Sequence, residues 1–320
     1  MMKNERSAMK KTALCELLGI EHPIILGAMG RISTGKVAAA VSNAGALGSV
    51  ATAFISIEEA RREIAECRLL TTKPFAANCP LFRPDADALL DAIIEEGVSI
   101  VSTSAGSPDR WAEKLKGSRA KWLHVVSNVR GAVRAAAAGV DVIIAEGTES
   151  GGIASREEVT TMVLIPQVVD AVNVPVVAAG GIADARGFLA ALALGAHGVQ
   201  MGTAFLATKE CDSVSNTYKQ VLLNASDTAT GLATRKAYPV RIVRNNLFDA
   251  LQHMDEEGKS REEIQMMLAQ KMTNMSQESD LENGLYIAGQ VAGLIKEIKT
   301  VRELIEDITT GAERLYRSLA

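Results

Sequence analysis

The stretches VVAAGGI at residues 176–182 and VQMGTAF at residues 199–205 carry the strongest signal in this sequence. Each is an apolar run that ends in a glycine turn, as expected for a buried strand that leads into a loop. Glycine lets a backbone approach a ligand closely because no Cβ intervenes. At the last two strands of a (β/α)8 barrel, such turns direct backbone N–H groups at a phosphate. We therefore predict a phosphate site at Gly180-Gly181 and Gly202-Thr203.

Composition narrows the class of protein. The chain has 320 residues, and 48% are hydrophobic while 4% are aromatic, which suits buried parallel strands covered by helices rich in small residues. The net charge of −4 argues against nucleic acid or anionic lipid as a partner. No apolar run is long enough for a membrane span, and residues 1–11 lack the apolar core of a signal peptide. Four scattered cysteines show no disulfide or metal spacing, so we expect a cytoplasmic protein without a metal site.

Strand-like and helix-like segments alternate along most of the chain. This alternation indicates a parallel sheet, and eight repeats favour closure into an α/β TIM barrel over a doubly wound open sheet. The predicted strands are Pro23–Leu26, Leu47–Ala51, Phe75–Asn78, Ile100–Thr103, Trp122–Val126, Val142–Ala145, Val174–Ala178 and Gly198–Met201. Helices are predicted for Thr34–Ser42, Ile57–Cys67, Ala86–Glu96, Val129–Ala138 and Asp184–Leu194, and Gly139 marks a helix end.

The pattern changes after Phe205. Residues from about 208 to 279 are more polar, rich in Met, Asn, Gln and charge, and lack strand-like runs. We predict a small, mainly helical insertion lobe there, on a barrel formed by residues 1–207 and about 280–320. The spacing of apolar residues in 301–308 predicts a helix that returns to cover the last strand.

The residues that follow the strands predict what the site binds, because the C-terminal ends of barrel strands face the active site. Gly27-Ala28-Met29-Gly30 follows the first strand, Asn78 ends the third, and Ser102–Gly106 follows the fourth. Glu146 and Glu149, with a glycine pair, follow the sixth. A flat polar ring could lie on Gly, Ala and Met while Asn and backbone amides bind its edge. Together with a phosphate site, this set of residues suggests FMN. For any single loop the alternative is an ordinary turn between a strand and a helix, where Gly and Asn are common.

Several ordered motifs identify a resemblance to a known family. They are PIILGAM (23–29), AAVSNAGALG (39–48), AEG (145–147), AAGGIAD (178–184), QMGTAFL (200–206), RIVRN (241–245) and AGQVAGL (288–294). The chain resembles the FMN-dependent barrel enzymes that comprise the nitronate monooxygenases, formerly called 2-nitropropane dioxygenases, and the FMN-dependent enoyl-[acyl-carrier-protein] reductases. The resemblance extends from Pro23 nearly to the C-terminus. Segments 101–108 and 160–162 are slightly more similar to the reductases.

The resemblance implies a role for individual positions. Ala28 and Met29, next to Gly27, would lie against the flavin ring, and Asn78 would bind its polar edge. Glu146 and Gly151 would belong to the flavin loop after the sixth strand. The phosphate would be held by Gly180, Gly181, Gly202 and Thr203, with Gln200 and Met201 leading into the last turn.

One position departs from the family pattern. The loop after the sixth strand usually ends its glycine pair with a histidine that handles protons, and here this position is Ile153. Isoleucine cannot exchange a proton, so the catalytic acid–base residue is unknown from the sequence. A lysine common on the fifth strand is replaced by Val125. His22 and His197 are predicted at the opposite end of the barrel, and His124 is predicted inside the fifth strand.

The remaining side chains of interest have structural interpretations that compete with functional ones. His253, in the lobe, is expected at the surface. Cys79 is expected to be a buried, inert thiol, although it follows a site residue in the sequence. The Met-rich segment 266–275 is interpreted as the core of the lobe, with a substrate wall as the second interpretation.

The sequence favours an enzyme and leaves its reaction open. Oxidation of a nitronate starts from an ionised carbon acid and needs no strong base, so loss of the histidine favours nitronate monooxygenase-like chemistry or flavin reduction by NADH or NADPH. The alternative is an enoyl-[acyl-carrier-protein] reductase, with acyl carrier protein as a partner. A non-catalytic flavin-binding barrel and a phosphosugar isomerase or synthase are further alternatives. A homodimer is implied by the resemblance, and backbone carbonyls could hold a monovalent cation without leaving a sequence trace.

Overall fold

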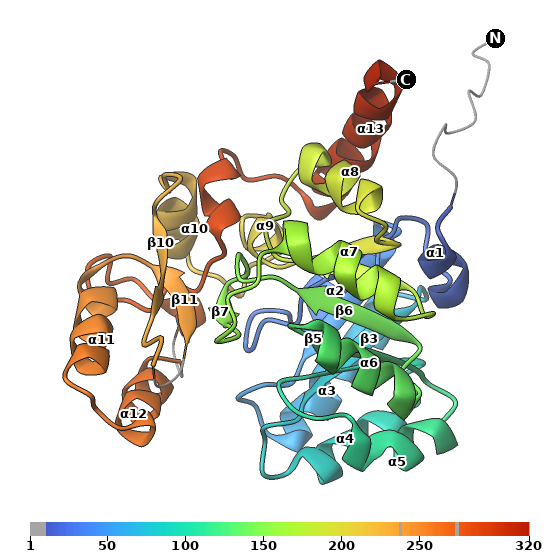
Figure 1. Ribbon diagram of the computed structural model, residues 1–320, viewed down its shortest axis with the longest axis horizontal. Coiled ribbons are helices and arrows are strands. Elements are labelled where there is room, and N and C mark those ends of the chain that lie inside the picture. The colour runs from blue at the N-terminus through green and yellow to red at the C-terminus, as the bar shows by residue number, and fades with distance from the viewer. Residues whose placement is uncertain (1–10, 237–238, 273–274, 320) are drawn as a thin grey trace.

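The computed structural model describes residues 11–236, 239–272 and 275–319, and its centre is a barrel of eight parallel strands (Figure 1). The strands pair in the order β1-β9-β8-β6-β5-β4-β3-β2. A parallel bridge between Ile25 and Leu47 joins the two ends of this order and closes the barrel. The strands are β1 (Ile24–Leu26), β2 (Gly48–Ala51), β3 (Phe75–Pro80), β4 (Ile100–Ser104), β5 (Lys121–Val126), β6 (Val142–Glu146), β8 (Val176–Ala179) and β9 (Gly198–Met201). The predicted barrel is confirmed, with all eight strands close to their expected positions.

A ring of helices covers the outside of the barrel, one after each strand. Several begin at a residue whose side chain accepts a backbone N–H: Ser56 does so in a capping box, and Asn128 and Asp184 in simpler caps. The last helix, α13, packs against α8 and α2, so the predicted closing helix is confirmed. The ring consists of α2 (Gly35–Asn43), α3 (Ile57–Leu70), α4 (Ala86–Glu95), α5 (Ala112–Gly117) after the 3-10 turn η1 (Asp109–Trp111), α6 (Val129–Ala138), α7 (Thr161–Ala171), α8 (Ala185–Ala193) and α13 (Val301–Leu319).

The two ends of the barrel differ. Helix α1 (Ala13–Leu18) closes the end at which the strands begin, where Leu14 and Leu18 pack with inward-facing side chains such as Ile25 and Leu123. The other end, where the strands finish, faces the lobe, which lies on the far side of the barrel from α1 (Figure 1). The site is therefore built from the loops at the open end.

The lobe combines helices with a small antiparallel sheet. Its helices are α10 (Asn216–Leu223), α11 (Asn246–Glu256) and α12 (Arg261–Met272). The expectation that it lacks strands was wrong: β10 (Thr230–Ala233) pairs with β11 (Val240–Val243), and β11 pairs with β7 (Gly152–Ile153). The strands are short, and β7 comes from the barrel loop after β6, so no local pattern reveals the pairing. The division of the chain at residues 208 and 279 stays a prediction.

Three short segments connect the barrel to the lobe or return from it. They are α9 (Thr203–Leu206), η2 (Met275–Gln277) and η3 (Gln290–Leu294). Within the described ranges no helix is long and apolar enough to cross a membrane. The N-terminal stretch that the sequence analysis judged not to be a signal peptide lies, up to residue 10, outside the described residues.

Candidate functional site

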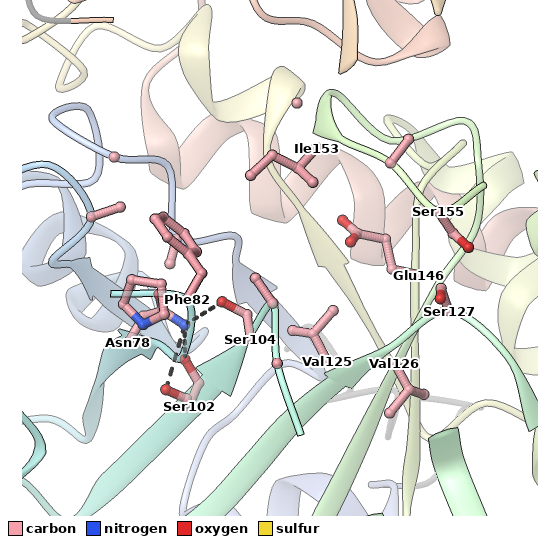
Figure 2. A pocket seen from close by; sticks show the side chains of 18 of the residues that line it. Asn78, Phe82, Ser102, Ser104, Val125, Val126, Ser127, Glu146, Ile153 and Ser155 are labelled. Carbon is pink, nitrogen blue, oxygen red and sulfur yellow. Dashed lines mark hydrogen bonds between the residues drawn. The ribbon is translucent and has the colours of Figure 1, made fainter. Parts of the chain in front are cut away.

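Two adjoining cavities occupy the open end of the barrel. The larger has a volume of about 650 Å³ and is shown in Figure 2; the smaller has a volume of about 130 Å³. Ala28, Glu146 and Gln200 line both, so the two spaces meet at the centre of the barrel mouth. Their walls come from the loops after the strands and from segments that return from the lobe.

The structure brings all the predicted flavin residues to these two cavities. Some line the larger cavity, others line the smaller one, and several line both. That they bind a flavin stays a prediction. The residues are Gly27, Ala28, Met29, Asn78, Glu146, Gly151, Gly180, Gly181, Gln200, Met201, Gly202 and Thr203.

Six glycines line the smaller cavity, together with polar residues such as Glu149, Gln200 and Thr203. Gly180 and Gly181 have φ angles of +92° and +74°, which an L-residue with a side chain adopts only with strain. A Cβ on Gly180 would lie 2.9 Å from the carbonyl oxygen of Gly147. Met201 lines this cavity with its backbone, because its buried side chain belongs to the core between strands and helices. The shape suits a small anion held by main-chain groups.

A segment that returns from the lobe lines the smaller cavity, a position that the sequence did not predict. The N–H of Gly289 donates to Oγ1 of Thr203 over 2.9 Å, and the N–H of Gln290 donates to the carbonyl of Glu149 over 2.9 Å. A Cβ on Gly151 would lie 2.7 Å from the backbone of Ala288. The family-like motif at 288–294 was the available signal, but its position follows from the path of the chain through the lobe.

Asn78 is fixed at the wall of the larger cavity. Its Nδ2 donates to Oγ of Ser102 over 3.0 Å and to Oγ of Ser104 over 3.4 Å (Figure 2). Thr52 donates its hydroxyl to the main-chain carbonyl oxygen of Asn78 and so fixes the strand end. The bonds to the two serines hold the side-chain amide in one orientation, as a residue that binds the edge of a ring requires.

Ile153 lies half-buried in the wall of the larger cavity (Figure 2). It belongs to β7, where it pairs with Val240 of the lobe sheet. The buried side chain of Arg241 fixes the same loop, because its Nε donates to the carbonyl of Thr148 over 2.9 Å. Burial lowers the pKa of Arg241 from its ordinary value. Position 153, where the resemblance led us to expect a histidine, is therefore apolar and held by the lobe.

The four histidines do not replace it. His124 lines the larger cavity but is 2% exposed, and its Nδ1 lies 2.7 Å from Oγ1 of Thr103. Burial lowers the pKa of His124 to about 4, so the ring is neutral near pH 7. His253 is an exposed residue that pairs with Glu257, and neither His22 nor His197 lines either cavity.

Cys79 is a buried thiol, as the sequence analysis expected. Its side chain packs in the core outside the strands, and its Sγ lies 3.6 Å from the carbonyl oxygen of Ala86. Burial raises its pKa to about 12, so it is not a nucleophile near neutral pH. Among the described residues no group of three or more His, Cys, Asp and Glu side chains is placed to hold a metal ion.

The outer wall of the larger cavity is apolar. Phe54 and Phe82 form an aromatic pair with ring centroids 6.1 Å apart, and both line the cavity. Met272 and Met275 line it from the lobe. Both methionines are also buried in the hydrophobic core, so this part of the Met-rich segment agrees with both interpretations of it, core and cavity wall; Thr273 and Asn274 lie outside the described residues.

The two cavities together fit FMN. The smaller one is lined by several glycines, including Gly180 and Gly181 with positive φ angles, and it matches a phosphate end. The larger one adjoins it and offers Ala28, Met29 and the fixed amide of Asn78 to a flat polar ring. The fit rests on the shape of the two spaces and on the donor groups of their walls.

Comparison with known proteins defines the family. A family model described as nitronate monooxygenase matches residues 11–311. The chain belongs to the nitronate monooxygenase family, and it is a flavin-dependent oxidoreductase. Family membership decides against the phosphosugar isomerase or synthase that the sequence left open.

Three relatives illustrate the range of the family. FabK from Thermotoga maritima is 41% identical, with a TM-score of 0.93 over 97% of this chain and 99% of that chain. A (3aS,4S,5R,7aS)-5-hydroxy-7a-methyl-1-oxo-octahydro-1H-indene-4-carboxyl-CoA dehydrogenase of Mycobacterium tuberculosis is 32% identical over 94% of this chain and 96% of its own length. A probable nitronate monooxygenase of Staphylococcus saprophyticus is 34% identical over 77% of this chain and 82% of its own length.

Proposed function

We propose that this protein binds FMN and reduces the carbon–carbon double bond of an acyl thioester, with NADH or NADPH as the reductant. The observation that carries the proposal is the larger cavity of about 650 Å³ with its apolar outer wall. Phe54, Phe82 and Met272 form much of that wall, which suits an acyl chain better than the few atoms of a simple nitronate. The likeness to FabK and to a carboxyl-CoA dehydrogenase supports the same substrate class.

The protein's own residues divide the work of binding. The turns at Gly180-Gly181 and Gly202-Thr203 would hold the phosphate, and Asn78 would bind the edge of the ring. Ile153 and Met29 would keep water from the reacting atoms. FMN, when bound, supplies reversible two-electron chemistry, while the protein sets orientation and access.

Stopped-flow spectroscopy tests this function. The oxidised yellow protein is mixed with NADH or NADPH, and the reduced protein is then mixed anaerobically with crotonyl-CoA. We expect rapid bleaching by one nicotinamide and recovery of the yellow colour on addition of the thioester. Colourless protein that does not take up FMN, or bleached protein that the thioester leaves unchanged, would contradict the proposal.

Oxidation of a nitronate is the second candidate, favoured by Ile153. A nitronate arrives with its carbon acid already ionised, so a site without the usual histidine can still accept it. The same instrument separates the two candidates: bleaching by propyl-2-nitronate, together with oxygen uptake and no response to a nicotinamide, would favour this reaction.

The carrier of the acyl group, the oligomeric state and the compartment are separate proposals. Rates with crotonyl-CoA and with crotonyl-acyl carrier protein would show which carrier is used, and sedimentation would test the proposed homodimer. The four cysteines are buried and free, which supports a reducing cytoplasm.

A further inference from the structure

Glu146 lies where a proton-exchanging group of this site would be needed. It is the last residue of β6, and its position alternates with the inward-facing Ile144 and Val142. Its side chain lines both cavities, and Figure 2 shows the carboxyl group pointing into the larger one, in the same part of the cavity as Ile153. A carboxyl group here borders both the flavin space and the substrate space.

The other titratable side chains that line the larger cavity are already engaged or lie at its mouth. His124 of β5 is bound to Thr103. Arg134 of α6 is ion-paired with Asp109, and Arg130 of the same helix is exposed. Among the described residues that line the larger cavity, Glu146 is the one carboxyl group.

The charged groups of the adjoining loop and lobe are also engaged. Both carboxylate oxygens of Glu149 lie 2.9 Å from the backbone N–H of Thr161, where they cap α7. Arg241 of β11 donates to the carbonyl of Thr148. The adjoining strands β8 and β9 present the uncharged Ala179 and Gln200. No cation therefore holds Glu146 in its ionised form in the part of the chain that the structure describes.

The environment of this carboxyl group brings its pKa close to neutral pH. Burial raises the pKa of Glu146 to about 7, and a hydrogen bond with Ser150 opposes the rise. A general acid or base works best when its pKa is close to the working pH.

We propose that Glu146 is the catalytic acid that takes over the proton transfer lost with the histidine at position 153. This rests on the proposed function. The double bond gains a hydride at the carbon β to the thioester carbonyl, and its electron pair moves to the α carbon. That carbon takes the proton of the Glu146 carboxyl group, which water at the cavity mouth reprotonates. NADH or NADPH supplies the electron pair.

The variant Glu146→Gln separates proton transfer from binding, because glutamine keeps the size of the side chain. We expect Glu146→Gln to retain FMN and to be reduced by the nicotinamide as the wild type is, while thioester turnover falls by about 100-fold or more, the typical contribution of a general acid. The limb of the pH–rate profile near pH 7 should disappear. Glu146→Asp should retain part of the activity, and adding Ile153→His to Glu146→Gln should restore part of it. Glu66→Gln, at an exposed position of α3, is the matched control.

A readout independent of turnover comes from infrared spectroscopy of the FMN-free protein. The protonated-carboxyl band of Glu146 should titrate near pH 7 in the wild type and be missing in Glu146→Gln. Unchanged turnover and pH profile in Glu146→Gln would overturn the assignment, as would loss of FMN in that variant, because the residue would then hold the cofactor. A wild type that no nicotinamide reduces would instead contradict the proposed function.

Discussion

The two cavities at the barrel mouth differ in the residues that line them. The smaller one is rich in glycine, with Gly180, Gly181, Gly202 and Gly289 among the six glycines that line it. The larger one is walled by side chains, including Asn78, Glu146 and the Phe54–Phe82 pair. Both lie on the same rigid strands, but only the larger one takes Met272 and Met275 from the lobe region.

This difference shows how one barrel can keep a cofactor and change a substrate. A backbone cradle tolerates little variation, because its shape depends on the absence of Cβ atoms. A wall of side chains can change its size and polarity without moving the strands. The replacement of the expected histidine by Ile153 falls in the larger cavity, where such changes leave the cofactor end intact.

The largest effect should come from damage to the smaller cavity. Gly181→Asp places a side chain on a residue with φ of +74° and a second carboxylate near Glu149. We expect the dissociation constant for FMN to rise about 100-fold or more, from backbone strain and from repulsion of the phosphate. Fluorescence titration of the FMN-free protein measures it.

Gly258→Asp is the matched control for this variant. Gly258 has the same φ of +74°, but nothing lies within 4 Å of its ideal Cβ and it lines neither cavity. It should bind FMN as the wild type does. Tight FMN binding by Gly181→Asp would show that the turn does not face the phosphate.

The next effect concerns the wall behind the larger cavity. His124 binds Thr103, and its pKa of about 4 lies below the ordinary 6.5. As the pH falls, the unfolded chain takes up this proton first, so the free energy of unfolding should fall between about pH 6.5 and pH 4. The loss is up to about 3 kcal/mol, since one pKa unit corresponds to about 1.4 kcal/mol.

Urea unfolding at several pH values measures this loss. His124→Gln should flatten the pH dependence in this window, whereas His253→Gln, at an exposed position, should leave it unchanged. Equal slopes for the wild type and His124→Gln would show that His124 titrates normally.

A smaller effect is expected at the substrate wall. Phe82 is 47% exposed, so Phe82→Ala removes a ring that a bound acyl chain would cover. We expect KM for a long-chain enoyl-CoA to rise about tenfold, the equivalent of half the burial of a phenylalanine, with FMN binding unchanged. Leu69→Ala, on the exposed face of α3, is the control. An equal rise of KM for crotonyl-CoA and for a long-chain thioester would argue against a chain-binding wall.

The smallest effect should come from restoring the family residue. Because Glu146 is proposed to supply the proton, Ile153→His alone should change thioester turnover by no more than about threefold. Steady-state kinetics near pH 7 measure it. A much larger gain would mean that proton transfer limits the wild type and that Glu146 does not perform it.

The glycine turns that line the smaller cavity could be predicted from the sequence because their signals are local. The turns at Gly180-Gly181 and Gly202-Thr203 are recognisable from a few neighbouring residues. The alternation of strands and helices then places them at one end of a barrel. The substrate side could not be predicted in the same way. Met272 and Ile287 reach the cavity only because the chain returns through the lobe.

The sequence by itself determined the barrel, the glycine turns and an apolar residue at position 153, since each depends on residue type and spacing along the chain. Tertiary structure decided the remaining features. It paired β7 with a strand of the lobe more than 80 residues later, brought Gly289 to Thr203, and isolated Glu146 from every described cation. Burial and long-range pairing depend on which segments meet in space, and no local pattern of residues encodes that.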